Sequence, residues 1–141
     1  MMQRGRRIAF DYGDVRIGVA VSDPDSILSS PLITLKASEK NLGKQISEIL
    51  SEIEPVVIYV GRPALLSGND GVATDKAMEF VALLGSITQI PIEMIDERMS
   101  TISAARNLRE AGRTAKDSKN AIDMAAAVAI LDFAIEIEKR K

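Results

Sequence analysis

The stretch Arg6–Asp23 decides the fold, and it reads Arg-Arg-Ile-Ala-Phe-Asp-Tyr-Gly-Asp-Val-Arg-Ile-Gly-Val-Ala-Val-Ser-Asp. Two apolar runs, 8–10 and 17–21, flank a polar turn. Runs rich in β-branched residues that are separated by turn residues predict two strands joined as a hairpin. One carboxylate, Asp11, stands at the end of the first run, where the chain would be entering a core.

A carboxylate in that place needs a partner, because an unpaired buried charge is very costly. A metal ion is one such partner. The other is a hydrogen bond within the turn, in which the Asp11 side chain contacts Gly13 or Asp14. The stretch by itself leaves both explanations open.

The composition restricts the classes of function. The chain has 141 residues, 46% of them apolar, which suits a single domain over 1–141 with a substantial core. Its formal net charge is -2, so it lacks the overall positive field with which many proteins hold nucleic acid. Binding to nucleic acid would therefore need local cationic groups or metal ions.

Two residue types are missing. The chain has no Cys and no His, which excludes disulfides, thiolate zinc sites, imidazole ligands and Ser-His-Asp or Cys-His catalysis. A bound metal must have oxygen ligands, and these favour Mg²⁺ or Mn²⁺. No apolar run has the length of a membrane span, and the basic start lacks the apolar core of a signal peptide. We expect a soluble cytoplasmic protein that does not enter a membrane.

Hydrophobic periodicity predicts the remaining elements. Alternating or continuous apolar runs indicate strands, and a period of about 3.6 residues indicates helices. These patterns predict strands over 31–36, 56–60 and 90–95, and helices over 74–84, 101–112 and 120–139. A further helix is expected between a cap at Ser38 and a stop at Pro55. A loop is expected over 64–71 and a basic, mobile segment over 113–119.

The order of these elements indicates an α/β fold. The first three strands form a hairpin and an edge strand. The two later strands each follow a helix, and such crossovers join parallel strands. We expect a mixed five-stranded sheet, antiparallel in its first three strands and parallel in the remainder, flanked by helices.

Acidic residues stand at several boundaries between the elements. Asp11 ends the first strand, Asp96 and Glu97 end the last strand, and Asp123 falls in the first turn of the last helix. Each has an ordinary explanation in a turn contact, a solvated loop or the helix dipole. Sites in open α/β sheets, however, gather at strand ends where the topology changes, and these positions would meet there.

Converging carboxylates repel one another unless cations lie between them. Two Mg²⁺ or Mn²⁺ ions held by such carboxylates support phosphodiester cleavage without His or Cys. Only one of Asp96 and Glu97 can reach the site, because neighbouring strand residues point to opposite faces. Nearby basic residues are candidate phosphate contacts, although each is also an ordinary surface charge: Arg16, Arg98, Arg113, Lys116 and Lys119.

Four segments together resemble the YqgF family and span nearly the whole chain. They are Asp-Tyr-Gly-Asp-Val-Arg-Ile-Gly-Val-Ala-Val-Ser-Asp (11–23), Val-Gly-Arg-Pro (60–63), Asp-Glu-Arg-Met-Ser-Thr (96–101) and Ile-Asp-Met-Ala-Ala-Ala-Val-Ala-Ile-Leu (122–131). The family's members are named as Holliday junction resolvases and as pre-16S ribosomal RNA nucleases.

The resemblance implies a ribonuclease-H-like fold and cleavage of nucleic acid with divalent metal, in maturation of the 5′ end of 16S ribosomal RNA. By position, the family's catalytic and metal-binding acids fall on Asp11, Glu97 and Asp123. Two residues depart from the family pattern. Arg62 replaces an apolar residue and adds a candidate phosphate contact, and Asp14 stands where uncharged or basic residues are frequent.

Other functions stay open at this point. Structured RNA, in pre-ribosomal particles, is favoured as the partner over DNA, with the protein a monomer or homodimer. A junction resolvase would instead cut DNA as a symmetric dimer, and a non-catalytic assembly protein would bind RNA without cutting it. The spacing from Asp11 to Gly18 also resembles a phosphate motif of actin-like ATPases, which need two such domains.

Overall fold

The computed structural model describes residues 3–13, 15–62, 71–96 and 116–140, with side chains over 3–13, 15–61, 76–95 and 124–140. Asp14, most of the expected loop at 64–71 and the expected helix at 101–112 lie outside the described residues. The five strands form one sheet in the order β3-β2-β1-β4-β5. They are β1 (Arg7–Tyr12), β2 (Arg16–Ser22), β3 (Ser29–Lys36), β4 (Val57–Arg62) and β5 (Ile92–Asp96).

The sheet is mixed, as predicted. β1 pairs antiparallel with β2, and β2 pairs antiparallel with β3. On its other side β1 pairs parallel with β4, which pairs parallel with β5. β1 is therefore the central strand, and the antiparallel and parallel halves of the sheet meet on it.

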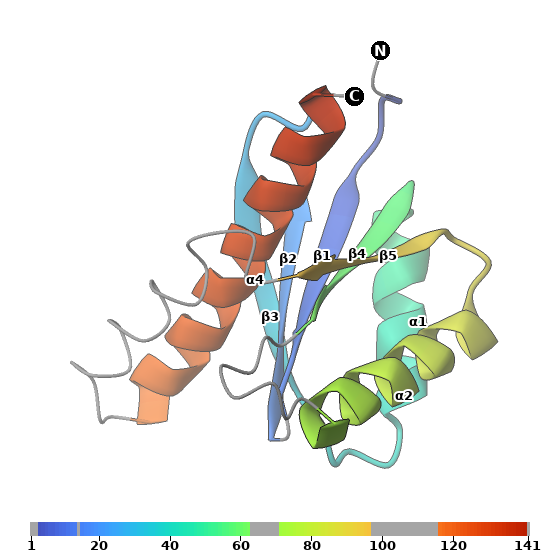
Figure 1. The fold of residues 1–141 in the computed structure, drawn as a ribbon, viewed down its shortest axis with the longest axis vertical. Coiled ribbons are helices and arrows are strands. Elements are labelled where there is room, and N and C mark those ends of the chain that lie inside the picture. The colour runs from blue at the N-terminus through green and yellow to red at the C-terminus, as the bar shows by residue number, and fades with distance from the viewer. Residues whose placement is uncertain (1–2, 14, 63–70, 97–115, 141) are drawn as a thin grey trace.

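Helices cover both faces of the sheet (Figure 1). α1 (Leu42–Ile53) and α2 (Gly71–Ile87) lie on one face, and α4 (Lys116–Arg140) crosses the other. The sheet separates two apolar clusters, because strand side chains alternate between its faces. One cluster joins Ile8 and Phe10 to α1 and α2, and the other joins Ala9 and Ala20 to α4.

The predicted cap of the first helix is wrong. α1 begins after Asn41, not Ser38, and Asn41 makes no side-chain capping hydrogen bond. A backbone hydrogen bond holds the chain before the helix instead: the Ala37 N–H donates to the Val15 carbonyl oxygen at 2.9 Å. The helix ends as predicted before Pro55, with Glu54 in the left-handed region at φ 51°.

The last helix is longer than predicted. It begins at Lys116, so 116–119 is helical rather than part of a mobile segment. These polar residues include neither Gly nor Pro, and each residue added to an existing helix gains a hydrogen bond. At 3.6 residues per turn, Asp123 lies in the third turn and not the first, so the helix dipole no longer accounts for it.

Candidate active site

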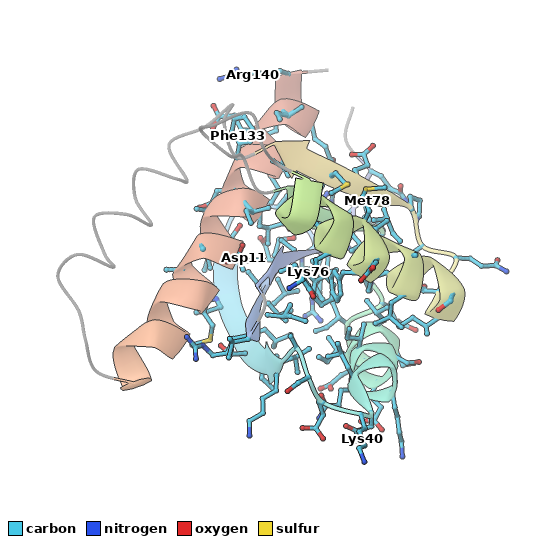
Figure 2. All side chains as sticks on the ribbon, turned by 60° about the horizontal axis from the view of Figure 1, so that its bottom comes forward. Asp11, Lys40, Lys76, Met78, Phe133 and Arg140 are labelled. Atoms are coloured by element: carbon cyan, nitrogen blue, oxygen red, sulfur yellow. The ribbon has the colours of Figure 1, made fainter. Side chains whose placement is uncertain are left out.

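Asp11 lies at the carboxyl end of the central strand, and its side chain is 7% exposed. Phe10 and Tyr12, its neighbours in β1, pack on the side of α1 and α2, whereas Ala9 packs against α4. Since side chains alternate along a strand, Asp11 faces α4. Figure 2 shows its side chain on that side of β1.

Small residues surround Asp11 on this face. Its direct partner on β2 is Gly18, so no side chain from the paired position covers the carboxylate. Ala20 of β2 and Ala127 of α4 are fully buried in the same layer. These short side chains allow α4 to pack closely on the sheet.

The carboxyl ends of the parallel strands lie side by side next to Asp11. Phe10, Val60 and Met94 form one row across β1, β4 and β5. Asp11 follows this row, and the last pair of β4 and β5 joins Arg62 to Asp96. The backbone therefore brings these three predicted site positions to one edge of the sheet.

The other two predicted ligands have no described side chains. Asp123 has a described backbone within α4 but no described side chain, and Glu97 lies outside the described residues. Among the residues with described side chains, no group of three acids comes together that could hold a metal ion. The three-carboxylate site thus stays a prediction.

The predicted phosphate contacts also differ in how much of each residue the structure describes. Arg16, half-buried at the start of β2, is the Cα partner of Lys36, so it lies at the same end of the sheet as Asp11. Lys116 and Lys119 belong to the first turns of α4, and their side chains, like that of Arg62, are not described. Arg98 and Arg113 lie outside the described residues.

A glycine shapes the turn after Asp11. A Cβ atom placed on Gly13 would lie 2.7 Å from the carbonyl oxygen of Arg16, a distance that real Cβ atoms essentially never show. Only glycine therefore fits this turn without a shift of the backbone. The turn joins β1 to β2 directly beside the candidate site.

The far end of α4 is attached to the sheet by a buried ion pair that the sequence patterns did not indicate. Arg7 Nη2 lies 2.9 Å from Glu138 Oε2, and Arg7 Nε also donates to this carboxylate. The Tyr59 hydroxyl of β4 donates to the same group. Arg7 further donates to the carbonyl oxygens of Gln3 and Gly5. The arginine is 2% exposed, and its charge is thus paired and hydrogen-bonded.

The Tyr59 hydroxyl is a hydrogen-bond donor to Glu138 in this cluster. Burial raises the pKa of its hydroxyl, and the hydrogen bond to Glu138 and the charge of that carboxylate raise the pKa further. The phenol therefore stays protonated over the physiological pH range. A basic residue at the start of a strand, such as Arg7, usually points into solvent. The one available signal in the sequence was the position of Arg7 directly before the apolar run 8–10.

The arrangement defines a class of protein: a ribonuclease-H-like fold, with the candidate site at the end of the central strand. The solved structure of Thermus thermophilus RuvC in complex with a Holliday junction substrate matches with a TM-score of 0.55. The match covers 96% of each chain at 16% sequence identity, a level that establishes the fold alone.

The particular family follows from sequence relatives. The family model described as "RuvX: Holliday junction resolvase" matches residues 5–136. A Streptomyces coelicolor protein named "Putative pre-16S rRNA nuclease" is 41% identical over 140 residues, 98% of this chain and 84% of that protein. A Rhodococcus opacus protein of the same name is 47% identical over 135 residues, 91% of this chain and 75% of that protein.

The chain belongs to the RuvX family, the YqgF family whose motifs it carries. The names of the family and of these relatives are names of nucleases, so this is a nuclease family. Within the ranges that the structure describes, no helix is both long enough and apolar enough to cross a bilayer.

Proposed function

We propose that this protein is a metal-dependent endonuclease that hydrolyses phosphodiester bonds in nucleic acid. The proposal rests mainly on Asp11, a buried carboxylate at the end of the central strand that faces α4 beside Gly18. A divalent cation suits such a carboxylate, because oxygen ligands of this kind bind Mg²⁺ and Mn²⁺. Membership in a nuclease family supports the class of reaction.

Glu97 and Asp123 are the proposed further ligands, holding two Mg²⁺ or Mn²⁺ ions with Asp11. Glu97 is favoured over Asp96 because the family's acid falls on Glu97 by its position in the Asp-Glu-Arg-Met-Ser-Thr motif. The donors fit the ions, since carboxylates without His or Cys are the expected set for these metals.

The position of α4 supports Asp123. In Figure 1 the C-terminal end of α4 lies beside the start of β1, so helix and strand run in opposite directions. Arg7, bound to Glu138, and Asp11 are about 13 Å apart along the strand, a length equal to about nine helical residues. This estimate puts Asp11 beneath the middle of α4, one to two turns from the Asp123 backbone.

Bound metal ions would supply an activated water and stabilise the leaving oxygen. The protein's own side chains would hold α4 and β1 in place and bind the substrate. Arg7 and Glu138 fix α4 on β1, and with it the spacing of the two carboxylate-bearing elements. The basic side chains proposed to bind the phosphate backbone are Arg16, Arg62, Arg98, Arg113, Lys116 and Lys119.

The proposed substrate is structured RNA, specifically the 5′ end of precursor 16S ribosomal RNA in pre-ribosomal particles. The names of the Streptomyces and Rhodococcus relatives support this choice. We further propose that the protein acts in the cytoplasm as one domain over residues 1–141. A second candidate is resolution of four-way DNA junctions, which the description of the family model favours.

The experiment compares the two substrates directly. Purified protein is incubated with a precursor 16S RNA fragment or a four-way DNA junction, in Mg²⁺, Mn²⁺ or chelator. We expect cleavage of the RNA that requires metal. Asp11→Asn should lower the rate by about 100-fold or more, since weaker perturbations of metal sites already cost 10–100-fold. Asp25→Asn, at an exposed aspartate, is the matched control and should retain the wild-type rate.

Each other outcome has a definite meaning. Cleavage of the junction but not of the RNA would transfer the assignment to the resolvase. RNA binding in chelator with no cleavage in any metal would replace the nuclease by a binding protein. Full activity of Asp11→Asn would overturn the proposed site.

A further inference from the structure

Exposed apolar side chains gather on one strip of the surface. Among the described residues, six large apolar side chains are at least 40% exposed. Four of these belong to the turn before β3 and to β3 itself: Ile27 (81%), Leu28 (66%), Leu32 (40%) and Ile33 (42%). A contiguous exposed apolar surface marks an interaction site more often than single scattered residues do.

The turn presents its part of this strip in a fixed conformation. The Asp23 carboxylate accepts hydrogen bonds from the backbone N–H groups of Asp25, Ile27 and Leu28, at 3.2, 2.7 and 2.8 Å. The bond from Leu28 is the main cause that lowers the pKa of Asp23. Ile27 and Leu28 are therefore held toward solvent by a built structure.

β3 is an edge strand that carries one proline, one charge and a register shift opposite Val19 and Ala20. No other described strand pairs with its outer edge. Natural edges are usually blunted by charges, but the eight residues of β3 include one charge, Lys36, at the carboxyl end. Pro31 is the one residue that removes an N–H donor from the edge.

A cavity of about 490 Å³ opens at the other end of β3, between the turn and the C-terminal half of α4. Its lining includes Ser26 and Ser29, whose buried hydroxyls have no hydrogen-bond partner in the described part of the chain. Buried hydroxyls are normally paired, so these two are suited to an incoming polar group. Charged residues of α4 complete the lining: Asp132, Glu136, Lys139 and Arg140.

Asp132, one of two acids and two bases in the lining, indicates a group that would fit the cavity. Glu136 is already paired with Arg140 at 3.2 Å, whereas Asp132 forms no ion pair with any described residue. A cation with several N–H donors would pair with Asp132 and donate to the two serine hydroxyls. A lysine side chain has three such donors on a flexible stem.

We propose that the strip is a homodimer interface, in which β3 of one copy pairs antiparallel with β3 of a second copy. In the proposed register, Leu32 lies opposite Ile33 of the second copy. In the same register, Lys36 of the second copy lies opposite Ser29, beside the cavity. Each copy thus supplies a cation to Asp132 in the cavity of the other, and the contact is made twice, as a twofold axis requires.

The charge pattern selects this occupant and this direction. Parallel pairing would set the two Lys36 side chains together, and like charges side by side oppose association. Antiparallel pairing separates them by the length of the strand, roughly 23 Å for eight residues. The dimer would have a continuous ten-stranded sheet with both α4 helices on one face. The two strand ends that carry Asp11 would lie at opposite ends of the dimer. The dimer is therefore independent of the proposed nuclease activity.

The test is the oligomeric state of the full chain by sedimentation equilibrium. We expect the wild type to dimerise, and Ile33→Lys to raise the dimer dissociation constant about tenfold or more. Met78→Lys, at an apolar residue of α2 that is 50% exposed, is the matched control and should not change it. Circular dichroism and urea unfolding would verify that each variant is folded.

A charge exchange tests the register. Lys36→Glu should weaken the dimer about tenfold, because the contact occurs twice, whereas Lys40→Glu, at an exposed lysine outside β3, should not. The double variant Lys36→Glu/Asp132→Lys should restore dimerisation. A wild type that stays monomeric at about 100 μM, a dimer indifferent to Ile33→Lys, or a double variant without recovery would each overturn the proposal.

Discussion

Arg7 at the start of β1 and Glu138 near the end of α4 form an ion pair at 2.9 Å across 131 positions of sequence. The pair lies on the same face of β1 as Asp11, because residues 7, 9 and 11 alternate with the apolar residues of the other face. It therefore sets how α4 lies over the strand that carries the proposed metal ligand. Tyr59 ties β4 to the same carboxylate, so three elements meet at this point.

Removing one partner of this pair should be costly. Glu138→Gln leaves the buried Arg7 charge without its counterion. We expect a loss of about 2–4 kcal/mol in the free energy of unfolding, somewhat below the usual cost because Glu138 keeps partial contact with water. Urea denaturation at neutral pH measures it. Glu136→Gln, which breaks an exposed pair with Arg140, should cost less than about 0.5 kcal/mol, and an equal loss in both variants would contradict a special role for Arg7–Glu138.

The Asp23 turn should give the fold a characteristic acid dependence. The pKa of Asp23 is lowered by its backbone hydrogen bonds, that from Leu28 first. The ionised carboxylate therefore stabilises the folded state above its unfolded pKa of about 3.9, and this contribution is lost as the pH falls through the lower folded pKa. Asp23→Ala should lower the urea midpoint at pH 7, and its difference from the wild type should narrow below about pH 4. A difference that stays constant down to pH 2 would exclude the carboxylate as the cause.

Two glycines should respond to alanine in opposite directions. At Gly13 the new Cβ would meet the Arg16 carbonyl oxygen at 2.7 Å, and we expect a loss of about 1–3 kcal/mol in the free energy of unfolding. At Gly85, within α2, a Cβ has nothing within 4 Å, and alanine should stabilise the helix by about 0.5–1 kcal/mol. Thermal and urea unfolding of both variants measure the difference. Destabilisation by Gly85→Ala would contradict the presence of open space at this position of α2.

Asp96 and Glu97 offer a discriminating pair for the metal site. If Glu97 is the ligand, Glu97→Gln should abolish calorimetric Mn²⁺ binding and lower RNA cleavage about 100-fold or more. Asp96→Asn should retain most of both, since neighbouring strand residues point to opposite faces. The reverse result would move the assignment to Asp96, and intact metal binding in both variants would remove this strand end from the site.

Much of the fold could be predicted because local patterns carry it. The alternation in 31–36, the apolar run at 56–60 and the helical period of Leu42, Ile46 and Leu50 each mark an element. Helix ends were less accurate, since Lys116 to Lys119 have no strong local preference and join α4 by extending a helix that tertiary packing stabilises. Asp11 could be singled out from the sequence because a carboxylate that ends an apolar run conflicts with its local environment.

The sequence by itself determined the element order, the mixed sheet and the restriction of any metal site to oxygen ligands, because periodicity and composition are local properties. Tertiary structure alone decided which face of β1 bears Asp11, which residue is the counterion of Arg7 and that β3 is an edge strand among the described strands. Arg7 looks like a surface charge in any local window. Its burial depends on Glu138 and Tyr59, which only the packing of α4 on the sheet brings within hydrogen-bond distance.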